Sequence, residues 1–151
     1  MTTEIEGIEG LAAYVGTHLG YSEWREITQQ QINTFADATG DHQWIHVDEA
    51  RAAAGPFGTT IAHGYLTLSL GPVFLKEIFR VEGVGLALNY GLNKVRFPSP
   101  VPVGSRVRAG ATLDKVEDVA GGAQVTVTVT FEIEGGPKPA CVAEILFRYL
   151  V

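Results

Sequence analysis

The stretch YLTLSLGPVFLKEIF, residues 65–79, is apolar around nearly its whole circumference when it is drawn as a helix. A helix without a polar stripe is one that the fold buries. Pro72 should kink this helix or disturb its middle turn, because proline has no N–H and crowds the preceding turn. The stretch is too short and too interrupted to cross a bilayer. It therefore predicts an interior helix, which needs an apolar surface around it.

Beyond this helix the hydrophobic pattern changes to a period of two residues, which is typical of strands. Residues 106–114 and 124–134 alternate between apolar and polar side chains, so each strand has one face to bury. Residues 120–122, Ala-Gly-Gly, form a turn between them and predict a hairpin. Further strands are expected at residues 86–97 and 141–150. A strongly curved antiparallel sheet around the buried helix satisfies these patterns and gives an α+β fold.

The first third of the chain predicts shorter elements. A short helix is expected at residues 8–18 and a brief strand at residues 24–27. Thr28 and Gln31 form a capping box at the start of the next helix. Gly40 ends that helix as a left-handed glycine would. Residues 1–151 are interpreted as one domain, with residues 1–21 as an N-terminal extension and residues 22–151 as the core.

Composition excludes several classes of partner. The net charge is −6 and no basic run is present, so no nucleic-acid partner is expected. Cys141 is the single cysteine, which excludes an internal disulfide and fits a reducing compartment. The N-terminal residues lack the pattern of a signal peptide. A cytoplasmic protein without a membrane partner is therefore expected.

Two short segments carry the chemistry, GDHQWIHVD at residues 40–48 and IAHGY at residues 61–65. Asp41 and His46 place a carboxylate and an imidazole five positions apart, which can accept and donate protons. The Gly64 N–H, after His63, can stabilise a developing negative charge. Together these groups could handle a water molecule and a polarised carbonyl in one pocket.

On these residues the chain resembles the MaoC-like family of (R)-specific enoyl-CoA hydratases, also called hydratase 2. The family motif runs Asp-x-Asn-Pro-(Ile/Leu)-His-x-Asp, then a Gly-Phe-type loop, then Ile-x-His-Gly. Here it corresponds to DHQWIHVD at 41–48, GPFG at 55–58 and IAHG at 61–64, and NKVRFPSPV at 93–101 is also similar. Gln43-Trp44 replaces the usual Asn-Pro, as in a subgroup related to nodulation protein N.

The resemblance implies the hot-dog fold, in which a curved antiparallel sheet wraps one long central helix. It also implies reversible hydration of trans-2-enoyl-CoA to (R)-3-hydroxyacyl-CoA, in fatty-acid metabolism. Asp41 then corresponds to the general base, His46 to its partner in orienting the water and relaying protons, and Gly64 to the amide donor for the thioester carbonyl. No metal or organic cofactor is implied, because coenzyme A belongs to the substrate. An acyl carrier protein thioester is an alternative substrate.

Other residues of the motif have two interpretations each. His63 either contacts substrate or fixes the loop by a hydrogen bond. Trp44, Phe57 and Tyr65 either line the substrate pocket or pack in the core, and Trp44 either narrows the pocket or points away from it. Asp48 is interpreted as the N-cap of a short helix that continues through residue 54.

Basic side chains on the expected strands either meet the coenzyme A phosphates or are ordinary solvated charges; these are Lys94, Arg96, Arg106 and Arg108. A homodimer is also expected, since single-domain hot-dog proteins usually pair. The polar face of residues 124–134, with Thr126, Thr128 and Thr130, is the predicted packing surface.

Three rival functions stay open. His42, His46, Asp48 and His63 offer nitrogen and oxygen ligands for a metal. A hot-dog thioesterase would use a carboxylate near the buried helix to hydrolyse the thioester. A non-catalytic acyl-thioester-binding protein would retain the fold alone.

Overall fold

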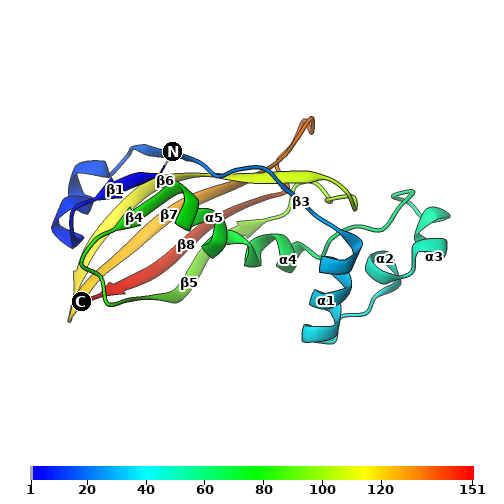
Figure 1. The fold of residues 1–151 in the computed structure, drawn as a ribbon, viewed down its shortest axis with the longest axis horizontal. Coiled ribbons are helices and arrows are strands. Elements are labelled where there is room, and N and C mark those ends of the chain that lie inside the picture. The colour runs from blue at the N-terminus through cyan, green and yellow to red at the C-terminus, as the bar shows by residue number, and fades with distance from the viewer. Residues whose placement is uncertain (1) are drawn as a thin grey trace.

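The computed structural model describes residues 2–151, and its main feature is a curved antiparallel sheet (Figure 1). The sheet consists of β2 (His18–Tyr21), β3 (Arg25–Glu26), β5 (Leu86–Arg96), β6 (Arg106–Val119), β7 (Gly122–Ile133) and β8 (Cys141–Leu150). The strand order is β2-β6-β7-β8-β5, and β3 also pairs with β6. Every pairing in this sheet is antiparallel, which confirms the predicted arrangement.

The predicted hairpin is the centre of the sheet. β6 and β7 pair along their whole length, and Val119 opposite Gly122 closes the turn. The apolar members of both alternations face the interior, where Val107, Val125 and Phe131 are fully buried. The two-residue period therefore identified both the strands and the face that each one buries.

The apolar stretch forms two consecutive helices, α4 (Gly64–Ser69) and α5 (Gly71–Ile78). Pro72 lies in the first turn of α5, where proline is tolerated because that N–H has no partner within the helix. The disturbance predicted at Pro72 therefore divides the stretch into two helices. Phe74 and Ile78 of α5 are fully buried against the sheet.

The helix pair is covered on one side more than on the other. Tyr65 is 70% exposed and Val73 is 36% exposed, although both belong to the stretch that was expected to be buried all round. The curved sheet wraps only the side of α4 and α5 that faces it (Figure 1). The remaining apolar side is available for contact with something outside this chain.

The N-terminal residues are part of the same core. β1 (Thr3–Ile5) runs parallel to β4 (Phe79–Val81), which follows α5 directly. The expected helix at residues 8–18 is only partly correct, since η1 (Ile8–Tyr14) is a 3-10 helix and His18 already begins β2. Buried side chains from this segment complete the core; they are Ile5, Leu11 and Leu19.

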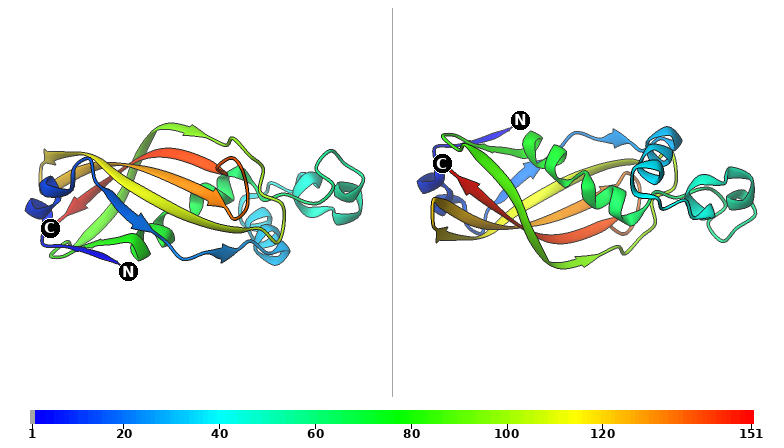
Figure 2. Two further views of the ribbon diagram at one scale, coloured as in Figure 1. Left: turned by 90° about the horizontal axis from the view of Figure 1, so that it is seen from above. Right: turned by 90° about the horizontal axis from the view of Figure 1, so that it is seen from below.

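A helical lobe projects from one end of the sheet (Figure 2). It contains α1 (Gln29–Thr39), α2 (Trp44–Val47) and α3 (Glu49–Ala53). The Thr28 hydroxyl accepts a hydrogen bond from the Gln31 N–H at 3.1 Å, and Gly40 ends α1 with a φ of 85°. The Asp48 carboxylate caps α3 by accepting from the Arg51 N–H at 3.0 Å. All three predicted helix ends are confirmed.

No helix within residues 2–151 has both the length and the apolar character that crossing a membrane requires.

Candidate active site

The imidazole of His46 is buried in the helical lobe, where a main-chain carbonyl fixes its tautomer. Its Nδ1–H donates to the Ile61 carbonyl at 2.7 Å, so Nε2 carries the free lone pair. Burial lowers the pKa of His46 below its ordinary 6.5; the hydrogen bond to Ile61 opposes this effect, and His63 adds to it. His46 is therefore neutral at neutral pH and presents a proton acceptor at Nε2.

A small network holds the backbone of His46. The Ile61 N–H donates to the Ile45 carbonyl at 3.0 Å, next to the side-chain bond between His46 and Ile61. Gln29 of α1 donates from Nε2 to the His46 carbonyl at 2.8 Å, and the buried Thr60 hydroxyl donates to the other end of Gln29. Sequence reasoning missed Gln29 and Thr60, because a glutamine in a first helical turn gives no sign of a distant partner.

His63 connects the segments of the motif. It is buried at the N-cap of α4 and donates from Nε2 to the Asp41 carbonyl at 3.0 Å. Its ring stacks on His46 with the centroids 3.9 Å apart and the planes inclined by 23°. Phe35 packs against the same ring with centroids 4.8 Å apart. The other nitrogen, Nδ1, is buried and has no hydrogen-bond partner within the described chain.

Asp41 completes the group from the exposed end of α1. Its carboxylate accepts from the Gln43 N–H at 3.3 Å. Polar atoms of Asp41, His46 and His63 lie within 4.8 Å of one another. The predicted acid and imidazole are therefore close enough for one water molecule to bridge them, since each of its hydrogen bonds spans about 2.8 Å.

The same three residues are the only combination among residues 2–151 that resembles a metal-ligand set. His42 does not belong to it, because its Nε2 lies 2.9 Å from Asp37 on the surface, and Asp48 is occupied as a helix cap. The lone pairs of two near-parallel stacked rings run side by side rather than converge, which is poor geometry for a shared ion.

Gly64 begins α4 directly after His63. No acceptor within residues 2–151 takes its N–H, as expected for the first residue of a helix. A Cβ at Gly64 would lie 3.1 Å from the ring of Phe97, so the glycine allows this aromatic ring to pack closely. Gly64 therefore has a packing role, and its backbone N–H is also free to donate a hydrogen bond.

The three aromatic residues predicted near the substrate are dispersed. Trp44 packs under the Arg51 guanidinium, 4.3 Å from its ring centroid, and lies close to Gly55. It therefore stabilises α2 against α3. Phe57 is exposed in the loop after α3, and Tyr65 makes an edge contact with Phe97.

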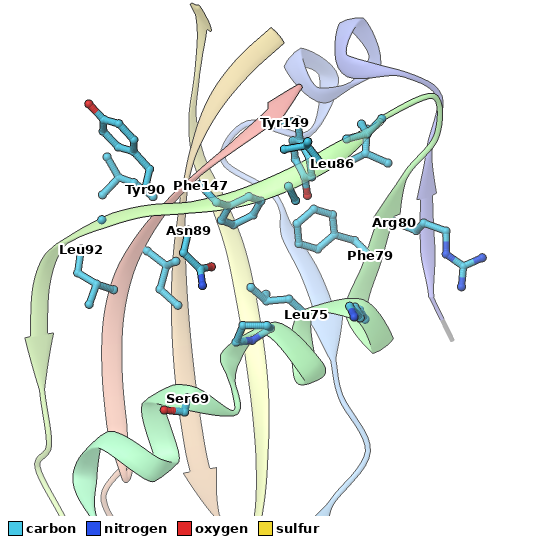
Figure 3. Close-up of a pocket in the computed structure, with 18 of the residues that line it drawn as sticks. Ser69, Leu75, Phe79, Arg80, Leu86, Asn89, Tyr90, Leu92, Phe147 and Tyr149 are labelled. Carbon is cyan, nitrogen blue, oxygen red and sulfur yellow. The ribbon is translucent and has the colours of Figure 1, made fainter. Parts of the chain in front are cut away.

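A groove of about 860 Å³ runs between the helix pair and the edge strand β5 (Figure 3). It begins at Leu68 and Ser69, about one turn beyond Gly64, and extends toward Phe147 and Tyr149 on β8. Its lining is mostly apolar. Sequence reasoning did not identify this groove, although the apolar residues of β5 were a signal for it. None of Trp44, Phe57 and Tyr65 lines it.

The basic side chains on the strands fall into two groups, those with a carboxylate partner and those without one in residues 2–151. Arg106 pairs with Glu134 at 3.1 Å and Arg108 with Glu132 at 2.7 Å, so their charges are already matched. Lys94 and Arg96 of β5 have no carboxylate partner in the part of the chain that the structure describes. Of the four candidates for phosphate contacts, these two remain available.

Comparisons with known proteins show what this chain is similar to. The profile of the MaoC like domain family matches residues 11–134. The 3-hydroxyacyl-thioester dehydratase Z of Mycobacterium tuberculosis is 62% identical over 146 residues, which cover 96% of this chain and 97% of that protein. Nodulation protein N of Rhizobium leguminosarum bv. viciae is 48% identical over 134 residues, covering 85% of this chain and 82% of that protein. A solved (R)-hydratase from A. caviae superimposes with a TM-score of 0.73 at 25% identity, covering 88% of this chain and 94% of the other. The expected hot-dog architecture is confirmed.

Proposed function

Because the chain belongs to the MaoC-like domain family, we propose that it catalyses the reversible hydration of trans-2-enoyl-CoA to (R)-3-hydroxyacyl-CoA. It is a lyase of the hydratase and dehydratase type that acts on acyl thioesters of fatty-acid metabolism. The observation that carries this proposal is that the Asp41 carboxylate and a ring nitrogen of the neutral His46 lie within 4.8 Å of each other, a gap that one water molecule can bridge.

In the hydration direction, water occupies this gap and donates one hydrogen bond to each acceptor. Its oxygen attacks C3 of the enoyl thioester while Asp41 accepts a proton, with His46 orienting the water. The electron pair of the C2–C3 double bond moves toward the thioester and forms an enolate. Protonation at C2 by the acid–imidazole pair restores the thioester, so the net change is the addition of one water. Dehydration is the reverse of these steps.

The enolate oxygen needs a donor, and the free Gly64 N–H supplies it. The α4 helix has only six residues because α5 starts anew at Gly71, so the single N–H matters more than the helix dipole. No step requires a metal or an organic cofactor. Burial raises the pKa of the Cys141 thiol to about 11, so this buried side chain is not proposed as a nucleophile.

Two features near Gly64 are proposed to bind the substrate. The apolar groove that starts at Leu68 takes the acyl chain, because it continues along α4 from Gly64. Lys94 and Arg96 lie at the end of β5 next to Phe97, which packs on Gly64, and they are proposed to meet the phosphates of coenzyme A. An acyl carrier protein would offer a phosphate to the same two cations.

We further propose that residues 1–151 act as one hot-dog domain and that two copies form a homodimer. The support for pairing is β5, which is the edge of the sheet and is exposed along nearly its whole length. Among its exposed apolar side chains, Leu88 does not line the groove that is assigned to the acyl chain. An apolar strand edge of this kind is a template for pairing with another chain. Thr128, by contrast, already donates to Asp114, so the threonine face is less available. A cytoplasmic location is proposed from the unpaired Cys141.

The test is incubation with crotonyl-CoA, following the conjugated enoyl absorbance and free thiol, with and without a chelator. Loss of absorbance without release of thiol, unaffected by the chelator, is the expected result. Release of thiol would instead identify a thioesterase, and loss of activity with the chelator a metal enzyme. No change across a series of enoyl chain lengths would leave only a binding protein.

A further inference from the structure

We propose that His63 is a positioning residue that sets the distance between the carboxylate of Asp41 and the imidazole of His46. This inference rests on the proposed hydratase function of that pair. His63 contacts both partners at once, through a hydrogen bond to one and a ring stack on the other. It also precedes Gly64, so one residue connects all three groups that the reaction uses.

The hydrogen bond from His63 is the shortest of those that Asp41 itself makes. Asp41 follows Gly40, where α1 ends in a left-handed turn, and the residue is exposed. Its own N–H reaches the Thr39 hydroxyl at 3.4 Å, whereas His63 donates to its carbonyl at 3.0 Å. Without His63, Asp41 is held by two longer and weaker hydrogen bonds, from its N–H to the Thr39 hydroxyl and from the Gln43 N–H to its carboxylate at 3.3 Å.

The ring stack controls the other partner. His46 is held at its Nδ1 edge by the Ile61 carbonyl, and packing against the face of the ring limits its tilt about that hydrogen bond. His63 lies on that face, and Phe35 packs against His63 in turn. The three rings form a chain from α1 to α2, and this contact fixes the direction in which the His46 Nε2 lone pair points.

The polar character of His63 is unnecessary for core packing. Its Nδ1 is buried without a hydrogen-bond partner in residues 2–151, and such an atom costs stability relative to an apolar ring of similar shape. Phenylalanine would fill the same space without that cost. What histidine adds is the Nε2–H donor, and its acceptor is the backbone of Asp41.

Two substitutions separate the contacts. His63→Phe keeps a ring against His46 and removes the donor, whereas His63→Gln places an amide donor near the position of Nε2 and removes the ring. We expect His63→Phe to lower kcat about 10- to 100-fold, the effect of a small misplacement of reacting groups, with KM within about threefold of the wild type. His63→Gln should recover part of the lost kcat, because it restores the donor to Asp41 but not the ring against His46. His42→Gln, an exposed histidine beside Asp41, is the matched control and should keep full activity.

The decisive measurement is a double-mutant cycle with Asp41→Asn. If His63 acts through Asp41, His63→Phe should change kcat by less than about twofold in the Asp41→Asn background. An additive loss, or a folded His63→Phe variant with wild-type kcat, would overturn the proposal. Nitrogen-15 NMR of the wild type gives a readout independent of turnover, and a proton on Nδ1 instead of Nε2 of His63 would also overturn it. A wild-type protein that hydrates no enoyl thioester contradicts the proposed function instead, so the two failures are distinguishable.

Discussion

The imidazoles of His46 and His63 stack 3.9 Å apart, and each donates its single N–H to a main-chain carbonyl. Each main-chain carbonyl therefore selects the ring nitrogen that carries the proton. For His46, burial and the neighbouring His63 both lower the pKa, so the stack is compatible with a neutral acceptor at residue 46.

The first prediction concerns pH. Burial lowers the pKa of His46, so kcat/KM should persist as the pH falls through 6.5 and decline on an acid limb whose apparent pKa is below that value. The pKa of His42 is raised above 6.5 mainly by its hydrogen bond to Asp37, so an acid limb above 6.5 would implicate that residue instead. A pH profile of the wild type and of His42→Gln distinguishes the two.

The lowered pKa of His46 also makes the stability of the fold depend on pH. Below pH 6.5 the unfolded chain takes up a proton at residue 46 before the folded chain does, so the contribution of His46 to stability is complete above 6.5 and is lost as the pH falls toward the lower folded value. Denaturant unfolding from neutral pH to about pH 5 should show this loss in the wild type. The loss should be smaller in His46→Gln, and equal pH dependence in both proteins would contradict the assignment.

The second prediction tests the acid–imidazole pair. Asp41→Asn and His46→Gln should each lower kcat on the order of 100-fold or more, because each removes a group that accepts a proton or orients the water. His42→Gln serves as the control from the same loop. A folded Asp41→Asn variant with comparable kcat would remove Asp41 from the mechanism.

The third prediction concerns the Gly64 donor. Gly64→Ala and Gly64→Pro both place a Cβ against Phe97, but only proline removes the N–H, and proline is tolerated at the first residue of a helix. Relative to the alanine variant, Gly64→Pro should lose about 100- to 1,000-fold in kcat, the usual effect of losing one such donor. Equal kcat in the two variants, with matching thermal unfolding, would show that this N–H does not contact the substrate.

The fourth prediction concerns stereochemistry. The hydration product should be the (R)-3-hydroxyacyl thioester, as the family membership implies. Coupling the reaction to an (S)-specific 3-hydroxyacyl-CoA dehydrogenase should yield no NADH, while an (R)-specific dehydrogenase should yield it. Rapid NADH formation with the (S)-specific enzyme would refute the prediction.

The fifth prediction concerns assembly. Light scattering should give about 32 kDa, twice the chain mass of 16.2 kDa. Leu88→Asp on the exposed edge strand should shift the mass toward the monomer, because a charge there opposes strand pairing. Val15→Asp alters a similarly exposed apolar side chain away from β5 and should leave the mass unchanged. A wild-type protein that is active as a monomer would rule the homodimer out.

Most of the fold could be predicted from local patterns in the sequence. Thr28, Gly40 and Asp48 cap their helices as expected, because a cap depends on residues within one turn. The alternation in β6 and β7 identified the hairpin for the same reason. The parallel pairing of β1 with β4 was missed, since two three-residue strands far apart in the chain leave no periodic signal.

The candidate site was predictable in part. Asp41, His46 and Gly64 belong to one motif of two nearby segments, so they could be predicted together. Ile61 acts through its main-chain carbonyl, which carries no residue identity, and Gln29 lies outside the motif, so neither role could be predicted. Trp44 was ambiguous because an aromatic side chain suits a pocket and a packed surface equally, and only the contact with Arg51 decides between them.

The strand order has a consequence for how the chain folds during synthesis. β8 is made after β5, β6 and β7, yet it lies between β7 and β5 in the sheet. Until residues 141–150 leave the ribosome, β5 has no neighbour, and the apolar surfaces of α4 and α5 face an incomplete sheet. The sheet therefore cannot close around α4 and α5 until β8 joins β5 to the hairpin of β6 and β7.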